Sequence, residues 1–232
     1  NNYTQCDIVA AAHDFGLNLY DQLGNLIWTY FDEFPETIVR ISQDGNYIVS
    51  AFHFGAGVQR GMHYFSHLRD GIPGWSPADG IPMWTFYMLD TAGVFWVAIS
   101  GSGDYVAVSG WFSGPASSYV ALLNRTGGAV WLDSFAASGG KGGYVRVDMP
   151  CDGKSVVAVN DDPDAVGCQL RYYSEAGGLG PGWDSGDNVP EWIYDPAISP
   201  NDDFYSVAIS GNGGIIATGP SSANSIYVLS SG

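Results

Sequence analysis

The chain has 232 residues, of which 8 are basic and 24 acidic, so its formal net charge is −16. Proteins hold a phosphate backbone with clustered Lys and Arg, and the sequence has no such cluster, which argues against nucleic-acid binding. Hydrophobic residues make up 46% of the chain, ample for a packed core, and no apolar run approaches the roughly 18 to 20 residues of a membrane-spanning helix. The composition predicts a folded, soluble, acidic protein without membrane insertion.

The N-terminus gives the first indication of location. The chain begins at Asn1 rather than Met, which fits either a removed signal peptide or a start inside a longer gene product. Asn2-Tyr3-Thr4 and Asn124-Arg125-Thr126 match the N-glycosylation pattern, which has physical meaning only outside the cytoplasm. We therefore expect a secreted, extracellular protein with Asn2 and Asn124 as glycosylation candidates.

A turn flanked by alternating apolar residues recurs along the chain, at residues 39–52, 97–111, 145–160 and 207–219. The period of two places one face of each strand in a core, and the Gly-rich centres allow the positive φ of a tight turn. Each segment therefore predicts a hairpin that forms the first and second strands of a repeat. Residues 7–14 read as a second strand, which leaves residues 1–5 as a short first strand of the first repeat.

A third strand, a Gly turn and a fourth strand centred on Trp follow, as at residues 17–31 and 119–135. Four tryptophans mark the fourth strands, and we expect them to pack between neighbouring repeats: Trp28, Trp84, Trp131 and Trp192. Residues 64–84 reappear at an offset of 108 as residues 172–192, with one enlarged loop. Long and short repeats therefore alternate.

Four strands repeated around a ring give the β-propeller pattern, with blades of about 40 to 50 residues, and 232 residues divided by five gives about 46. The Val97–Tyr105 hairpin and the Gly24–Trp28 strand resemble WD-type and quinoprotein-like propeller repeats, especially those of archaeal and bacterial surface proteins. The resemblance covers essentially the whole chain and implies an all-β, five-bladed propeller of four-stranded antiparallel blades. Such propellers serve as binding platforms, assembly modules and, in larger versions, enzymes. The expected blades are residues 1–34, 35–91, 92–137, 138–196 and 197–232.

The last blade is expected to be incomplete, because the chain ends at Gly232 where a turn into a fourth strand is due. Its third strand then has an open edge, whose N–H and C=O groups invite another strand. Either a neighbouring subunit or an extended peptide supplies that strand, or the blade has three strands facing water, or the sequence is cut at both ends. The assembly-edge candidates are Asn1, Asn2, Tyr3, Thr4, Gln5, Ser225, Ile226, Tyr227, Val228, Leu229 and Ser230.

Residues that could support catalysis or bind a metal are few. His63 and His67 flank one third strand, too far apart to share a metal, and we expect the histidines, including His13 and His53, to be surface or loop residues. Acidic runs at 160–164 and 201–203 suit calcium but match no EF-hand loop, so they read as solvated turns.

Asp148 is the one carboxylate found on a predicted inner strand, and a glycoside-cleaving propeller needs a pair. We expect no catalytic residue, no cofactor and no metal, with calcium as the alternative.

Trp75 and Trp183 lie in the two enlarged loops, with Asp79 and Asp187 beside them. Two roles stay open for these tryptophans: to cover their own blade, or to stack on a sugar ring or dock on a neighbouring protomer. The four residues are the recognition-loop candidates.

The cysteines, Cys6, Cys151 and Cys168, are odd in number, and one disulfide plus one free thiol is the simplest interpretation. The pairing stays open, and Cys6 could instead bridge to another subunit.

Together these features predict a non-catalytic, secreted protein that assembles or binds at the cell exterior. The sharper form is a self-associating subunit of a filament or surface layer, joined by strand complementation at the incomplete blade, with another surface protein as the other partner. The alternative is a carbohydrate-binding or glycoside-cleaving propeller that uses the Trp75 and Trp183 loops.

Overall fold

The computed structural model describes residues 8–32, 36–52, 60–67, 74–88, 92–112, 117–136, 144–161, 169–176, 182–195, 204–220 and 225–231. These residues form five antiparallel sheets. The first contains β1 (Ile8–His13), β2 (Gly16–Asp21) and β3 (Leu26–Phe31). The second contains β4 (Glu36–Ile41), β5 (Tyr47–Phe52), β6 (Arg60–Ser66) and β7 (Trp84–Met88). A 3₁₀ turn, η1 (Pro77–Gly80), precedes β7.

The remaining sheets follow the same order along the chain. The third contains β8 (Ala92–Ile99), β9 (Tyr105–Phe112), β10 (Ser117–Asn124) and β11 (Ala129–Ala136). The fourth contains β12 (Tyr144–Asp148), β13 (Ser155–Asp161), β14 (Leu170–Ser174) and β15 (Trp192–Tyr194). The last contains β16 (Phe204–Ile209), β17 (Ile215–Pro220) and β18 (Tyr227–Ser230).

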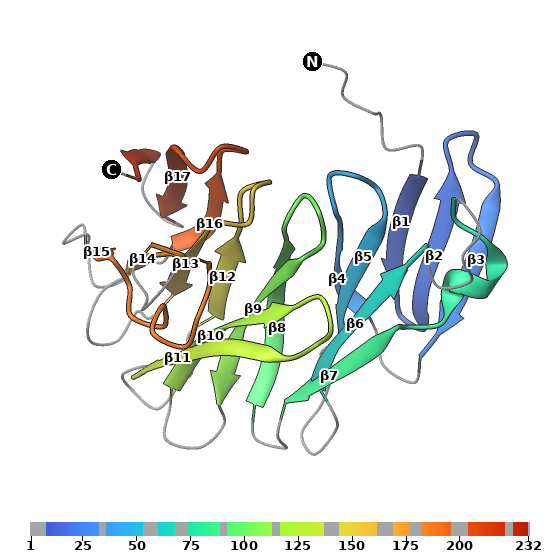
Figure 1. Ribbon diagram of the computed structural model, residues 1–232, viewed down its shortest axis with the longest axis horizontal. Coiled ribbons are helices and arrows are strands. Elements are labelled where there is room, and N and C mark those ends of the chain that lie inside the picture. The colour runs from blue at the N-terminus through green and yellow to red at the C-terminus, as the bar shows by residue number, and fades with distance from the viewer. Residues whose placement is uncertain are drawn as a thin grey trace.

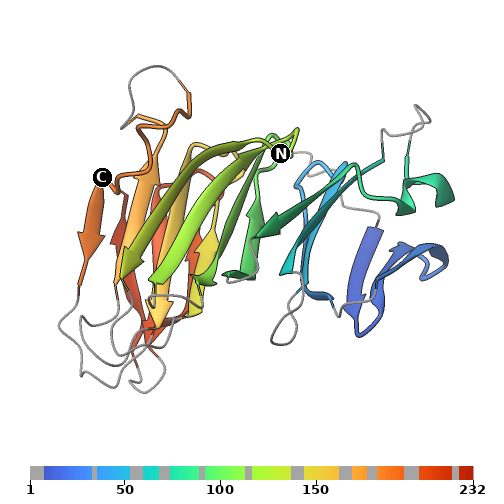
Figure 2. The same cartoon turned by 90° about the horizontal axis from the view of Figure 1, so that it is seen from below.

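The sheets stand side by side in chain order, and the first and last lie at opposite ends of the molecule (Figure 1, Figure 2). They form the blades of a β-propeller, but the arc is open and the ring is not closed. The four predicted hairpins are confirmed, as is the incomplete last blade, which has three strands. The predicted first strand at residues 1–5 lies outside the described residues. In the part of the chain that is described, no helix is long and apolar enough to cross a membrane.

Each sheet packs on the next through one repeated contact. The second strand of a sheet lies against the first strand of the following sheet, as β5 lies against β8 and β13 against β16. First strands of neighbouring sheets also lie against each other, as β8 lies against β12, so the contact of β1 with β4 fits either position. Trp28 marks β3 as a fourth strand, and counting back through β2 makes β1 a second strand, as the sequence predicts. Each of the four sheet-to-sheet interfaces has its own cluster of buried apolar side chains.

The tryptophans of the fourth strands fill these interfaces, as predicted. Trp28 stacks on Phe65 of the second sheet at 5.4 Å between ring centroids, and Trp131 stacks on Tyr173 of the fourth sheet at 5.0 Å. The indole N–H of Trp84 crosses to the third sheet and donates to the Arg125 carbonyl at 2.7 Å.

The turns between first and second strands are joined by a ladder of backbone hydrogen bonds. The Asp44 N–H donates to the Gly101 carbonyl at 3.1 Å, the Gly101 N–H to Cys151 at 2.8 Å, and the Cys151 N–H to Gly211 at 3.1 Å. We call this series the inner-turn ladder. A Gly with positive φ shapes each of its turns, and Gly103, with φ of 70°, is one of them.

The tight packing of the ladder can be tested at Gly103. A Cβ there would lie 2.2 Å from the Tyr47 ring, whereas a Cβ at Gly24, also at positive φ, meets nothing within 4 Å. We expect Gly24→Ala to lower the free energy of unfolding by about 1 to 2 kcal/mol through backbone strain alone. Gly103→Ala should cost about 1 to 3 kcal/mol more, because the Tyr47 ring must move. Urea unfolding of both variants measures the difference, and equal losses would contradict this view of the interface.

Candidate functional site

The last sheet ends in a free edge among the described residues. β18 pairs with β17 on one side, and among the described residues no strand pairs with its other side. In the three complete sheets that position is occupied by β7, β11 or β15. The predicted open edge at residues 225–230 is therefore present, and its strand runs from Tyr227 to Ser230.

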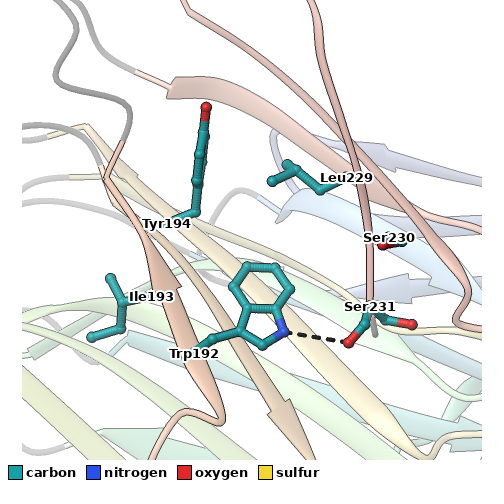
Figure 3. Close-up of a pocket in the computed structure, with 6 residues that line it drawn as sticks. All are labelled: Trp192, Ile193, Tyr194, Leu229, Ser230 and Ser231. Carbon is teal, nitrogen blue, oxygen red and sulfur yellow. Dashed lines mark hydrogen bonds between the residues drawn. The ribbon is translucent and has the colours of Figure 1, made fainter.

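A hollow of about 350 Å³ lies beside this edge, between β15 and β18. Figure 3 shows its lining, with Leu229 extending toward Tyr194 above the indole of Trp192. The indole N–H donates to the Ser231 carbonyl at 3.4 Å, which ties the end of the last sheet to the fourth. The residues that line the hollow are Trp192, Ile193, Tyr194, Leu229, Ser230 and Ser231.

The side chains of β18 alternate between the core and solvent. Tyr227 and Leu229 pack toward the fourth sheet, whereas Val228 is 68% exposed and Ile226, just before the strand, is 76% exposed. In a propeller the outward face of each blade packs on the next blade, and no sheet covers this one among the described residues. The edge therefore presents both unpaired backbone groups and apolar side chains to the surroundings.

The two predicted recognition loops are anchored within the fold. The indole N–H of Trp75 donates to the Gly45 carbonyl at 2.8 Å, and that of Trp183 donates to Gly153 at 2.6 Å. Each ring also contacts the tryptophan of the preceding sheet, Trp75 on Trp28 at 6.0 Å and Trp183 on Trp131 at 5.8 Å. Each loop covers its own blade and also fastens that blade to the one before it.

The acids of these loops hold the loop backbone. Asp79 accepts the Ser76 N–H at 2.8 Å, and Asp187 accepts the Asp184 N–H at 2.6 Å. Since the Trp183 ring is only 9% exposed, it does not present a face on which a sugar could stack. The geometry gives the carbohydrate alternative no support.

The remaining predicted residues have simpler places. Asn124 is the last residue of β10, and its Oδ1 accepts the Thr126 and Gly128 N–H groups of the turn that follows. Cys151, one of the three disulfide candidates, has a free thiol and lies in the inner-turn ladder. The other candidates lie outside the described residues: Asn1 to Gln5, Cys6, His53, Cys168 and the acidic residues 201–203.

A polar cluster that was not predicted from the sequence lies between the first and second sheets. His63 and His67 are not surface residues, since they are 2% and 9% exposed. The His63 Nε2 lies 2.6 Å from Asp32 Oδ2 and 3.5 Å from Glu36 Oε1, and its Nδ1 lies 2.9 Å from the Thr85 hydroxyl. His63 is buried because β6 is the third strand of its sheet and is paired on both sides.

Glu36 begins the inner strand β4, so Asp148 is not the only carboxylate on an inner strand. The strand starts three residues before the apolar pattern from which it was predicted. The pKa of Glu36 is raised to about 8, chiefly by burial; the Ser50 hydroxyl acts against this rise, and the negative charge of Asp32 adds to it as the smallest of the three effects. The sequence repeat could have drawn attention to this site, because the offset of 108 places His63 at the position of Arg171.

No protein-family model and no curated protein matches the chain. Solved structures do match it, among them the β-propeller domain of Cps50 (Swd1) from Myceliophteria thermophila, with TM-score 0.64 and 11% identity over 97% of this chain and 67% of that one. Kuenenia stuttgartiensis hydrazine synthase matches with TM-score 0.65 and 12% identity, over 97% and 68% of the two chains. KlAtg21, in its complex with the coiled coil of AgAtg16, matches with TM-score 0.68 and 10% identity, over 97% and 63%.

The chain thus spans about two thirds of the length of these structures. At such identities the likeness shows the fold alone, and that fold is a β-propeller. The predicted β-propeller fold is confirmed.

The anchoring role of Trp183 can be tested by two substitutions. Trp183→Phe removes the donor to Gly153 and leaves that carbonyl unpaired, so we expect a loss of about 1 to 3 kcal/mol in unfolding free energy. Trp183→Ala also leaves a cavity against Trp131 and should cost about 3 to 5 kcal/mol. Leu23→Ala, at an exposed turn, should change stability by less than about 0.5 kcal/mol. Chemical denaturation gives all three values, and a wild-type stability for Trp183→Ala would contradict the anchoring role.

Asp148 predicts a pH dependence of stability. Burial raises the pKa of its carboxyl, although the Asp148 Oδ2 accepts the Ile209 N–H at 2.9 Å. Because the folded state disfavours the ionised form, this residue's contribution to stability is lost as the pH rises through its folded pKa. Asp148→Asn should therefore be more stable than wild type near pH 7, and the difference should shrink toward about pH 3. Unfolding curves of both proteins across this pH range measure the difference in stability. A difference that grows toward acid pH would contradict the prediction.

Proposed function

We propose that this protein is a non-catalytic binding and assembly module that accepts an extended protein strand at the free edge of β18. The observation that carries the proposal is the three-stranded last sheet, whose third strand is unpaired on its outer side among the described residues. An added strand would occupy the place that β7, β11 and β15 hold in the complete sheets. Backbone hydrogen bonds would supply affinity, and pockets for alternate side chains would supply specificity.

The hollow beside the edge is suited to such a strand. Its lining includes Trp192, Ile193, Tyr194 and Leu229, and it borders the edge that the added strand would pair with. The fourth strand of each complete sheet carries a Trp, and in the long blades this Trp stacks on a Tyr of the third strand, as Trp84 stacks on Tyr64 at 4.7 Å. We therefore expect a partner strand with alternating apolar residues, one of them aromatic.

The sharper form of the proposal is self-association. The two ends of the open arc are unlike surfaces, and both expose large apolar side chains: Val9, Phe15 and Phe31 in the first sheet, and Tyr205, Ile215 and Val228 in the last. Contact between unlike surfaces of identical chains is heterologous, and it produces a closed ring or an open filament according to the rotation between copies. Assembly of the first sheet of one copy on the last sheet of another would cover both ends.

The proposal includes an extracellular setting, on grounds of the sequence. Charged residues are only 14% of the chain, and two N-glycosylation patterns are present. Of these, Asn124 is the last residue of β10 before a surface turn of the third sheet, away from the β18 edge in chain and in sheet order. Glycosylation there is compatible with strand addition at the last sheet.

Light scattering of the purified chain against concentration tests self-association at the edge. We expect particles larger than the 24.7 kDa chain, and a monomer for Val228→Lys, because an added charge on an edge strand opposes strand addition. Val189→Lys is the matched control, since Val189 is also 68% exposed but lies in the loop before β15. A wild-type monomer at every concentration would contradict self-association, and equal effects of the two substitutions would exclude β18 as the edge involved.

A further inference from the structure

The polar cluster at the joint between the first and second sheets has no role in strand addition. Asp32 directly follows β3, Glu36 begins β4, and His63 lies in the middle of β6. One ligating atom from each of the three lies within 4.8 Å of the other two. The ring of Phe52 stacks on the imidazole at 4.7 Å and helps to separate it from solvent.

The equivalent joint between the third and fourth sheets shows what this cluster lacks. There Arg171 takes the place of His63 in the repeat, and its guanidinium lies 3.3 Å from Asp133 Oδ2. The Tyr173 hydroxyl donates to the same carboxylate oxygen at 2.7 Å. That joint has one carboxylate and one permanent cation, so its charges balance within the protein.

In the described part of the first joint, the cluster has two carboxylates and one imidazole. Among the described residues, no Lys or Arg forms an ion pair with Asp32 or Glu36. The side chain of Glu36 is fully buried, and neither of its oxygens has a hydrogen-bond partner in the described chain. The Ser50 hydroxyl offsets the cost of burial only in part, and a buried carboxylate without a full counter-charge is unfavourable unless a proton or a cation supplies the missing charge.

We propose that Asp32, Glu36 and His63 bind a single divalent transition-metal cation, Zn²⁺ in the first instance. One imidazole nitrogen and two carboxylate oxygens are a ligand set that zinc accepts in tetrahedral sites. Calcium, the metal that the acidic runs of the sequence suggested, takes six to eight oxygen ligands, so it fits this cluster poorly. The Tyr30 hydroxyl lies 3.4 Å from the same imidazole nitrogen, His63 Nε2.

The orientation of His63 suits a metal ligand. Metal-binding histidines usually donate their other ring N–H to a neighbouring acceptor, and here Nδ1 lies 2.9 Å from the Thr85 hydroxyl. Without a metal, the 2.6 Å contact of Nε2 with Asp32 requires a proton between the two atoms. Two ligands of a tetrahedral zinc ion lie about 3.3 Å apart, so the ion would replace that proton, which leaves to solvent, and spread the pair slightly.

The bound ion would have a structural role. The cluster joins β3 and β4 on either side of the connection between two sheets, and His63 is 2% exposed, which gives a substrate no access. The ion would fix the terminal first sheet to the second, where the third and fourth sheets use Arg171 and Asp133. This role is independent of the proposed strand addition at β18.

Calorimetric titration of the chelator-treated full chain with ZnCl₂ tests the site. We expect one ion per chain, a higher melting temperature with zinc, and Co²⁺ absorption bands typical of tetrahedral nitrogen and oxygen ligation. Glu36→Gln keeps the side-chain shape and should weaken zinc binding by at least about 10-fold. His67→Gln, in a buried histidine of the same sheet outside the cluster, should leave it unchanged.

A second variant keeps the test independent of folding defects. His63→Arg supplies the guanidinium found at Arg171, so we expect it to fold, to lose zinc binding, and to melt at a temperature that zinc does not change. Absence of zinc binding by the wild type would overturn the proposal. So would wild-type affinity in Glu36→Gln or His63→Arg, or a site that takes Ca²⁺ in preference to Zn²⁺.

Discussion

Packing of the second strand of each sheet on the first strand of the next is the interaction on which the rest of this structure depends. A single sheet of three or four short strands buries too little apolar surface to be stable alone, so each blade is stabilised by its neighbours. The inner-turn ladder fixes the spacing of four of the blades, from Asp44 through Gly101 and Cys151 to Gly211. At this spacing the side chains of neighbouring blades are in close contact, and a Cβ at Gly103 has no room beside Tyr47.

The alternation of long and short blades follows from how the outer parts of the interfaces are closed. Blades diverge outward, and a tryptophan on the fourth strand lies in the gap between neighbouring sheets. In the second and fourth sheets an enlarged loop brings a second indole, Trp75 or Trp183, onto the tryptophan of the preceding sheet. The two joints built in this way then differ in their polar residues, with His63 in one and Arg171 in the other.

An arc held together by contacts between neighbours leaves two incomplete surfaces, one at each end. The sheets in the middle bury both faces, whereas the first and last bury one among the described residues. The exposed apolar residues of the end sheets, Phe31 at one end and Val228 at the other, are the direct consequence. We therefore expect the function at the two ends of the arc, where among the described residues one face of the sheet has no neighbouring sheet. The middle sheets serve as a scaffold.

The sequence by itself determined the strands, the turns and the repeat, because these depend on residues close together in the chain. Alternating apolar residues and a Gly at positive φ define the hairpin around Gly103 without reference to the rest of the protein, and the missing fourth strand could be counted. The tertiary structure alone decided that His63 is buried beside Asp32 and Glu36, that Trp183 faces inward, and that the arc stays open. Each of these depends on which sheet lies against which and at what angle, and that geometry comes from the summed packing of all blades rather than from any local pattern.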